Sequence, residues 1–320
     1  MAMTVIPFEI GCDVSKDELV IARSDQPDTL TLANDPQAIR DWLTSLPGPA
    51  RLGVEATNTY HLALVEAAHR AGHTVYVVDG YCLNQYRKSL RGRAKTDLTD
   101  AKLLRRFVNR EWRDLRPWQP PSKGYLALQR LLHRRATLVQ ARQALQQSFR
   151  DLPDLKTSAK AALAQLKRLE QRLIRLMQRV IRRHDWRDDF ERCQALEGVG
   201  PLIAIALVMA FNRGRFRTSD AFIAFLGMDV RVRQSGKYRG RSKLTKQGDP
   251  ELRRLLYMAA MTARNSPAWR PYYEQLLARG FSKIQALVIL ARKLARVAFA
   301  LLKNQDTYQP RIPKEACPAT

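Results

Sequence analysis

The chain has 320 residues, with 55 Lys and Arg against 30 Asp and Glu, so its formal net charge is +25 and its isoelectric point is about 10.5. This length suggests two or three domains, and an apolar content of 45% is enough to form real cores, which excludes a disordered chain. A transmembrane helix and a secretory signal are not expected, because the sequence lacks a stretch of about 18 apolar residues and a basic segment before a cleavage site. The positive surplus indicates a polyanionic partner, with nucleic acid as the first choice and an acidic membrane surface as the second.

The charge is unevenly distributed along the chain. Residues 1–60 contain four Lys or Arg and nine Asp or Glu, a net charge of −5, whereas the rest of the chain has a net charge of +30. The acidic end either holds a cation or simply forms an acidic surface, and the charge count leaves both open. The scattered cysteines fit a reducing cytoplasm and argue against a disulfide framework or a structural zinc site. They are Cys12, Cys82, Cys193 and Cys317.

The first 120 residues have the pattern of an α/β domain. Short β-rich runs between turn residues predict a three-stranded meander, and helices and strands then alternate. The predicted strands cover residues 8–14, 18–24, 29–33, 51–56 and 73–79, and the predicted helices cover 36–45, 60–70 and 97–110. The last helix is expected to begin at Thr96 or Asp97. This order is typical of a ribonuclease-H-like sheet, a fold that hosts several chemistries.

A proline-rich break at residues 117–123 predicts a domain boundary. Two long helices are expected after it, over 124–150 and 155–184. In the second, Leu166, Leu169, Leu173, Leu176 and Val180 recur at alternating spacings of three and four residues. Such a seam predicts an antiparallel hairpin or a dimer contact, and a plain amphipathic bundle helix fits equally well.

From residue 190 the chain is predicted to be mainly helical, with amphipathic helices over 251–264 and 283–303. The Gly-Val-Gly sequence at Gly198 and Gly200 suggests a helix-hairpin-helix element whose backbone amides face a DNA phosphate, or else an ordinary tight turn. We therefore expect four segments: an α/β domain at 1–118, a helical segment at 119–189, a helical domain at 190–304 and a loose tail at 305–320.

Four carboxylates form a candidate metal site. Asp13 and Glu55 each lie at the end of an apolar predicted strand, and Asp97 and Asp100 share one face of a helical turn. Acids placed in this way can converge over the middle of a ribonuclease-H-like sheet and hold two Mg²⁺ ions for phosphodiester transfer. Each acid also has a simpler interpretation, because Asp97 can cap its helix, the helix dipole favours Asp100, and Asp13 suits a nucleotide site of the sugar-kinase type.

A second candidate site is the basic stretch at residues 231–250. Its cations would line phosphates, and Tyr238 could stack on a base. The candidate nucleic-acid contacts are Arg231, Arg233, Lys237, Tyr238, Arg239, Arg241, Lys243 and Lys246. Ser235 lies among these cations, where it is either an activated nucleophile or an ordinary serine in a DNA-contacting loop. The spacing alone favours the ordinary serine.

The sequence resembles the DEDD transposases, the insertion-sequence family numbered one hundred and ten, which includes Piv-type DNA invertases. The resemblance runs from about residue 8 to residue 305. The motifs that support it are IGCDVSK (10–16), GVEAT (53–57), KTDLTDAKLL (95–104), LEGVGP (196–201), FLGM (225–228), QSGK (234–237) and GRSKLTKQGDPELRRLL (240–256). By resemblance, a RuvC-like domain holds the tetrad Asp13, Glu55, Asp97 and Asp100, a coiled-coil segment follows, and the C-terminal transposase domain supplies Ser235 as the nucleophile. Ser242 lies in the same loop and competes for that role.

This resemblance implies a bacterial transposase that cuts and rejoins DNA through a phosphoserine link, with Mg²⁺ or Mn²⁺ held by the four acids. It also implies target and donor DNA, a bridge-type guide RNA, dimers that pair into tetramers, and a cytoplasmic, nucleoid-associated location without a membrane partner. Base pairing by the RNA would then select the sequence. Two alternatives remain open: a RuvC-like junction nuclease that uses water, and a non-catalytic nucleic-acid-binding protein.

Overall fold

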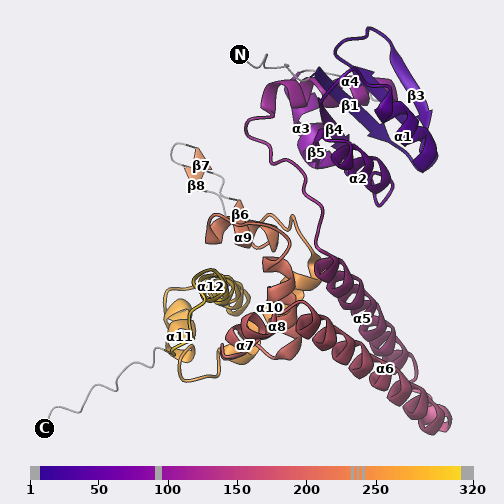
Figure 1. Cartoon of the computed structure of the whole chain (residues 1–320). Helices are drawn as coiled ribbons and strands as arrows, with labels where there is room; N and C mark the ends of the chain where they lie inside the picture. The colour runs from indigo at the N-terminus through magenta and orange to yellow at the C-terminus, as the bar shows by residue number, and fades with distance from the viewer. Residues whose placement is uncertain (1–7, 91–95, 232–233, 236–237, 240–241, 311–320) are drawn as a thin grey trace, which may run out of the picture. The chain divides into compact units, whose positions relative to one another are not determined.

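A computed structural model describes residues 8–90, 96–231, 234–235, 238–239 and 242–310 (Figure 1). The chain divides into two compact units, and the boundary falls between Pro120 and Pro121. We call them the N-terminal unit and the C-terminal unit and describe each by itself. In the described part of the chain, no helix is long and apolar enough to cross a membrane.

The N-terminal unit is a five-stranded sheet with helices on it. Strands β1 (Phe8–Val14), β2 (Glu18–Arg23) and β3 (Thr29–Ala33) form an antiparallel meander, and β4 (Ala50–Glu55) and β5 (Thr74–Val78) are added parallel to β1. The strand order is β3-β2-β1-β4-β5. The helices are α1 (Pro36–Thr44), α2 (Leu62–Arg70), α3 (Gly80–Ser89) and α4 (Asp97–Glu111). The predicted α/β order is confirmed, and the predicted elements match the observed ones to within about two residues.

Helix α3 was not expected from the sequence. Asp79 caps its N-terminus by accepting hydrogen bonds from the backbone amides of Tyr81 and Cys82. Leu83 is the helix's buried residue, so the run is polar and has little of the periodicity that reveals a helix. The helix nevertheless packs on α4 through Tyr86, whose ring meets that of Phe107 edge to face.

The two faces of the sheet are built differently. On one face, Ile10, Cys12 and Val14 of β1 join α1 and α2 in the main core of the unit. On the other face, Gly11 of β1 lies beside Gly53 of β4 in the parallel register. Because side chains alternate along a strand, the two glycines leave this second face bare where α4 crosses it.

Helix α4 contacts the sheet through its backbone. A β-carbon on Gly11 would lie 2.0 Å from the carbonyl oxygen of Ala101 and 2.3 Å from the amide nitrogen of Arg105. A β-carbon on Gly53 would lie 2.5 Å from a methyl carbon of Val108. Only glycine permits this close approach, so these two positions fix where α4 crosses β1 and β4.

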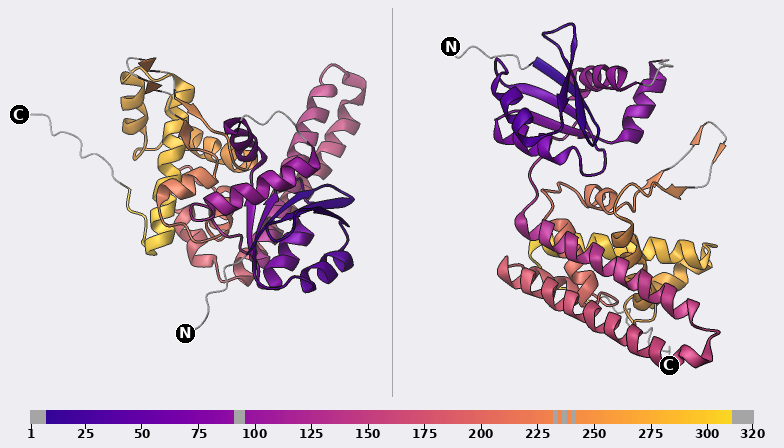
Figure 2. Two further views of the ribbon diagram at one scale, coloured as in Figure 1. Left: turned by 90° about the horizontal axis from the view of Figure 1, so that it is seen from above. Right: turned by 90° about the vertical axis from the view of Figure 1, so that its right-hand side faces the viewer.

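The C-terminal unit begins with an antiparallel helical hairpin, α5 (Lys123–Ser148) and α6 (Lys156–Arg183), joined by a short 3₁₀ turn at Pro153–Leu155. The two helices lie side by side along their length (Figures 1 and 2). The predicted seam is displaced around α6, because Met177 and Ile181 are its buried residues and Leu169 is 48% exposed. Tertiary packing against α5 and the bundle, rather than the leucine repeat, selects the buried face.

The remaining helices form a bundle around α8 (Pro201–Phe211), which is buried on all sides from Ala204 to Ala210. Its other members are α7 (Arg187–Gln194), α9 (Ser219–Phe225), α10 (Pro250–Ala263), α11 (Arg270–Ala278) and α12 (Lys283–Asn304). They share one continuous core with the base of the hairpin. The mainly helical C-terminal region is therefore confirmed.

The expected basic loop forms a β-ribbon between α9 and α10. Strands β6 (Val230–Arg231) and β9 (Lys243–Leu244) pair at its base, and β7 (Gln234–Ser235) and β8 (Tyr238–Arg239) pair farther out. Figure 1 shows the ribbon projecting from the helical bundle. We call residues 230–244 the serine ribbon.

Replacing Gly11 tests the role of the bare face. Gly11→Ala should lower the free energy of unfolding of the N-terminal unit by about 3 kcal/mol, because the new methyl group meets backbone atoms that cannot give way independently. Hydrogen exchange of the β1 and β4 amides measures this unit separately from the C-terminal unit.

Gly48→Ala is the matched control, because a β-carbon there would have no atom within 4 Å. It should change protection by less than about 0.5 kcal/mol. Equal protection in the two variants would contradict the close approach of α4 to the sheet.

Candidate active site

Asp13 and Glu55 lie at the carboxyl ends of two neighbouring parallel strands. Each follows a bare-face glycine by two residues, Asp13 after Gly11 on β1 and Glu55 after Gly53 on β4. Alternation therefore directs both carboxylates to the face that α4 covers. Both side chains are half-buried at this edge of the sheet.

The first turn of α4 supplies the other two acids. Thr96 is the N-cap and forms a reciprocal capping box with Thr99, so Asp97 is not the cap. Asp97 is exposed, whereas Asp100 is 5% exposed. A buried acid at this position needs a compensating partner.

The charges of the other three acids act on Asp13. Burial, followed by the negative charges of Asp97, Asp100 and Glu55, raises the pKa of Asp13 to about 6. A hydrogen bond from the backbone amide of Val14 opposes this shift. Residues from β1, β4 and α4, up to 87 positions apart in the sequence, thus form one negatively charged cluster. We call it the acid cluster.

Two further residues shape the acid cluster, and the sequence analysis missed both. Arg87 of α3 forms an ion pair with Asp100 at 2.5 Å, and both side chains are largely buried. Gly80, the first residue of α3, lies against Glu55, because a β-carbon there would be 2.5 Å from its Oε1 atom. Both residues belong to helix α3, which the sequence did not predict. Their positions beside the acids could therefore not be predicted either.

The cluster is not a ready-made ligand cage. Among the described residues, no three His, Cys, Asp or Glu side chains are grouped closely enough to hold one metal ion. Asp100 is instead engaged by Arg87, and Asp97 lies open to solvent. The arrangement is a set of hard oxygen donors whose mutual repulsion a cation would relieve.

The serine ribbon places the two candidate serines differently. Ser235 pairs with Tyr238 in the outer part of the ribbon, and Ser242 precedes the basal strand β9 and is exposed. The base is fastened by Thr245, whose hydroxyl donates to Asp229 and whose amide donates to the Asp229 carbonyl. Ser235 is therefore the serine farther from the bundle along the ribbon.

The cations of the ribbon include a like-charge pair. Arg231 lies directly opposite Lys243 in the antiparallel register, and both are exposed. Like charges at such positions destabilise a strand pair, and a polyanion would relieve the repulsion. Lys246 is also exposed, and Arg239 belongs to β8. The predicted contacts Arg233, Lys237 and Arg241 lie outside the described residues.

The two glycines of the predicted helix-hairpin-helix differ in environment. Gly198 has a φ of +86°, and a β-carbon there would lie 2.4 Å from the carbonyl oxygen of Ala259 in α10. It is required for packing inside the bundle. Gly200 is exposed at the N-terminus of α8, and a β-carbon there would meet open space.

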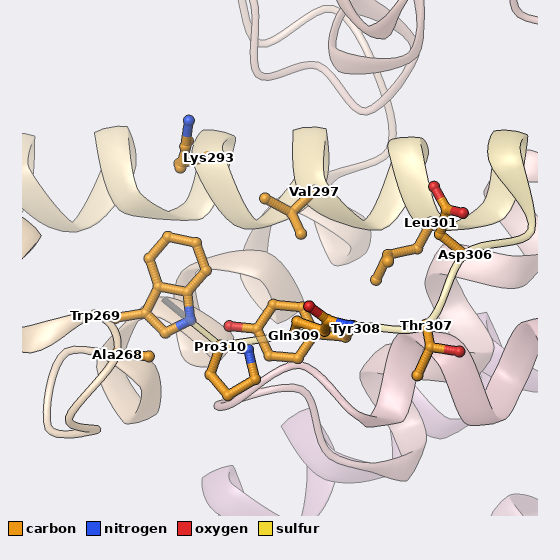
Figure 3. A pocket seen from close by; sticks show the side chains of 10 residues that line it. All are labelled: Ala268, Trp269, Lys293, Val297, Leu301, Asp306, Thr307, Tyr308, Gln309 and Pro310. Atoms are coloured by element: carbon orange, nitrogen blue, oxygen red, sulfur yellow. The ribbon is translucent and has the colours of Figure 1, made fainter. Parts of the chain in front are cut away.

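A cavity of about 880 Å³ lies elsewhere in the C-terminal unit (Figure 3). Its lining includes Trp269 and Tyr308, both of which donate hydrogen bonds to Glu197, and burial raises the pKa of the Tyr308 hydroxyl. The predicted loose tail is thus anchored at Tyr308. The lining contains none of the predicted site residues, so the cavity is not part of this site.

Comparison with known proteins identifies the class. Residues 10–155 match a family model of the DEDD type described as a transposase, and residues 191–274 match the transposase IS116/IS110/IS902 family. The chain is therefore a DNA transposase or recombinase. It belongs to the IS110 family of transposases.

Individual relatives agree with this assignment. The chain is 28% identical to the pilin gene-inverting protein of Moraxella bovis, over 81% of this chain and 82% of the relative. It is 27% identical to a probable family 20 transposase of Pseudomonas aeruginosa, over 94% of this chain and 98% of the relative. An insertion element IS110 protein of Streptomyces coelicolor is 31% identical over 37% of this chain and 30% of its own length.

The raised pKa of Asp13 predicts a pH dependence. Asp13 binds its proton more tightly in the folded chain than in the unfolded chain, so folding stability should fall as the pH rises from about 4 to about 6. Solvent screens this half-buried site, and we expect a loss of about 1–2 kcal/mol. Asp13→Asn should remove this loss and be the more stable protein at pH 7, as measured by urea unfolding in the presence of a chelator.

Asp28→Asn, at an exposed turn carboxylate, is the control and should keep the wild-type profile. Parallel pH profiles for wild type and Asp13→Asn would show that the acid cluster does not repel the charge of Asp13.

Proposed function

We propose that this transposase exchanges DNA strands through a serine ester on Ser235, with the acid cluster holding divalent metal ions at the scissile phosphate. The observation that supports the proposal is that Asp13 and Glu55 end neighbouring parallel strands on the face covered by α4, whose first turn carries Asp97 and Asp100. The charges of the other three acids contribute, after burial, to the raised pKa of Asp13. Carboxylates that repel one another lower the stability of the fold, and such groups are typical of catalytic sites.

The fold supports a RuvC-like assignment for the N-terminal unit. An antiparallel meander extended by two parallel strands, in the order β3-β2-β1-β4-β5, is the arrangement expected of a ribonuclease-H-like sheet. We assign the catalytic domain to residues 1–118, the coiled-coil segment to 119–189, the transposase domain with its helix-hairpin-helix-like turn to 190–304, and the tail to 305–320.

The donor chemistry of the acid cluster fits Mg²⁺ or Mn²⁺, since both ions take oxygen ligands such as carboxylates. When bound, such ions activate the attacking oxygen and stabilise the leaving oxygen of a phosphodiester. Asp13, Glu55 and Asp97 would provide the ligands, and Asp100 would join them on release from Arg87. The negative cluster would otherwise repel the DNA backbone.

Ser235 would perform the covalent step. Its hydroxyl oxygen attacks the phosphorus, the hydroxyl proton passes to solvent or a nearby base, and the phosphodiester bond breaks to release a DNA hydroxyl end. The incoming strand's hydroxyl then attacks the phosphoserine, which rejoins DNA and frees the serine. The outer position of Ser235 on the ribbon, and its match to the serine of the family motif QSGK, favour it over Ser242.

The family resemblance adds a guide RNA and an assembly. A bridge-type RNA would pair with target and donor DNA, so that the protein contacts backbones and base pairing selects the sequence. Dimers pairing into tetramers would bring the acid cluster of one subunit to the serine ribbon of another. Because its substrate is DNA, we place the protein on the bacterial nucleoid in the cytoplasm.

Ser235→Ala tests the mechanism directly. The variant should lose strand exchange by about 10³-fold or more and should form no covalent protein–DNA adduct, because the nucleophile is gone. Ser242→Ala should retain both activities. The assay follows recombined DNA and denaturation-resistant adducts with Mg²⁺ present.

Asp13→Asn separates the remaining alternatives. This variant should form neither recombined DNA nor covalent protein–DNA adducts, while its DNA binding stays intact. If the protein only binds nucleic acid, neither wild type nor the variant should form these products. Full nicking by Ser235→Ala would instead identify a water-dependent nuclease and overturn the serine step.

The requirement for a guide RNA is tested by removing RNA from the recombination reaction. Recombination by purified protein should require an RNA that copurifies from the native host and is encoded beside the gene, because the cations of the serine ribbon contact backbone without reading sequence. Strand exchange at full rate after ribonuclease treatment, or recovery of random RNA alone, would refute the guide. A scrambled RNA of equal length is the matched control.

A further inference from the structure

Helix α6 has an unusual charge composition. It contains nine Lys or Arg residues and one acid, Glu170, and its partner α5 contains no acid at all. Glu170 is already engaged, because Arg135 and Arg142 of α5 both form ion pairs with it. The acidic residues of the hairpin therefore do not neutralise the positive charge of α6.

Five arginines of α6 form a straight exposed row, which we call the arginine stripe. They follow one another at alternating spacings of four and three residues. At about 100° per residue, this spacing keeps them within an arc of about 80°, on the side opposite buried Met177. All five are exposed, and in the described part of the chain none of them forms an ion pair. They are Arg168, Arg172, Arg175, Arg179 and Arg182.

Repulsion within the arginine stripe lowers the stability of helix α6. Arg168 with Arg172 and Arg175 with Arg179 are like-charge pairs four residues apart, and such pairs destabilise a helix. A solvated helix face needs no such alignment, since dispersed or mixed charges keep it equally soluble. A polyanion lying along the stripe would turn this repulsion into attraction.

The dimensions suit the backbone of duplex DNA. From Arg168 to Arg182 the stripe extends about 21 Å, with a cation at every 5 Å or so. Duplex DNA has about one negative charge per 1.7 Å of its axis, so each guanidinium has phosphates within reach along the whole length. The hairpin projects from the bundle (Figures 1 and 2), and the exposure of all five arginines shows that this face is accessible within its unit.

We propose that the arginine stripe is a docking surface for the phosphate backbone of duplex DNA. The proposal rests on DNA being the substrate, as family membership implies, but not on the serine step. The stripe contributes affinity without sequence choice, because arginines on a straight helix face contact phosphates rather than base edges. It adds to the serine ribbon a second and longer contact on the same unit.

Neutralising the middle of the stripe tests this role. The triple variant Arg172→Gln, Arg175→Gln and Arg179→Gln in the full chain should bind a 30-base-pair duplex about 10- to 100-fold more weakly at 0.1 M salt. The slope of log affinity against log salt should become shallower by about 2 to 3, because three phosphate contacts are lost. Fluorescence anisotropy without metal measures both, and circular dichroism checks that helicity is kept.

A control triple removes the same charge elsewhere. Arg270→Gln, Arg279→Gln and Lys283→Gln alter three exposed cations, at the two ends of α11 and the start of α12. They should leave affinity and salt slope within about twofold of wild type. If both triple variants bind duplex DNA equally weakly, the loss of affinity comes from the lower net charge and not from the stripe. That result would overturn the proposal.

Binding to an RNA hairpin distinguishes a surface for RNA from a surface for duplex DNA. If the stripe variant loses affinity for an RNA hairpin but not for duplex DNA, the surface belongs to RNA and the proposal is wrong. Because binding is measured without metal and without strand exchange, failure of the stripe stays distinct from failure of the serine mechanism.

Discussion

The contact of α4 with the sheet is the constraint on which the candidate site depends. Gly11 and Gly53 lie side by side on β1 and β4, and their missing side chains let the backbone of α4 rest on the sheet. Two residues farther along each strand are Asp13 and Glu55. The same close approach that fixes α4 therefore holds its acidic first turn over the strand ends, where burial and repulsion raise the pKa of Asp13.

Opposite charges occupy separate parts of the chain for a common purpose. The acid cluster would repel a DNA backbone, and the serine ribbon and arginine stripe would attract it. Arg87 offsets part of the negative charge by pairing with buried Asp100. Removing one partner of such a buried pair leaves an uncompensated charge, so α3 supports the site although it contributes no acid.

Much of the fold and part of the site follow from the sequence. The α/β order, the long hairpin and the four acids each have a local signature: alternation, heptad spacing, or an acid at a strand end or in the first turn of a helix. Helix α3 has none, and Arg87 was missed with it. The most buried side of α6 also had to come from the tertiary structure, because Met177 and Leu169 are both apolar and only the neighbouring helices decide which is buried.

The sequence by itself determined the partner class and the family resemblance, because these depend on residue types and their order. Tertiary structure decided what the acids experience: Asp13 with a raised pKa, Asp100 paired with Arg87, and Gly198 committed to packing on α10. It also aligned the arginine stripe on an exposed face. Charge interactions depend on distance and burial, and both arise only when segments far apart in the chain are packed together.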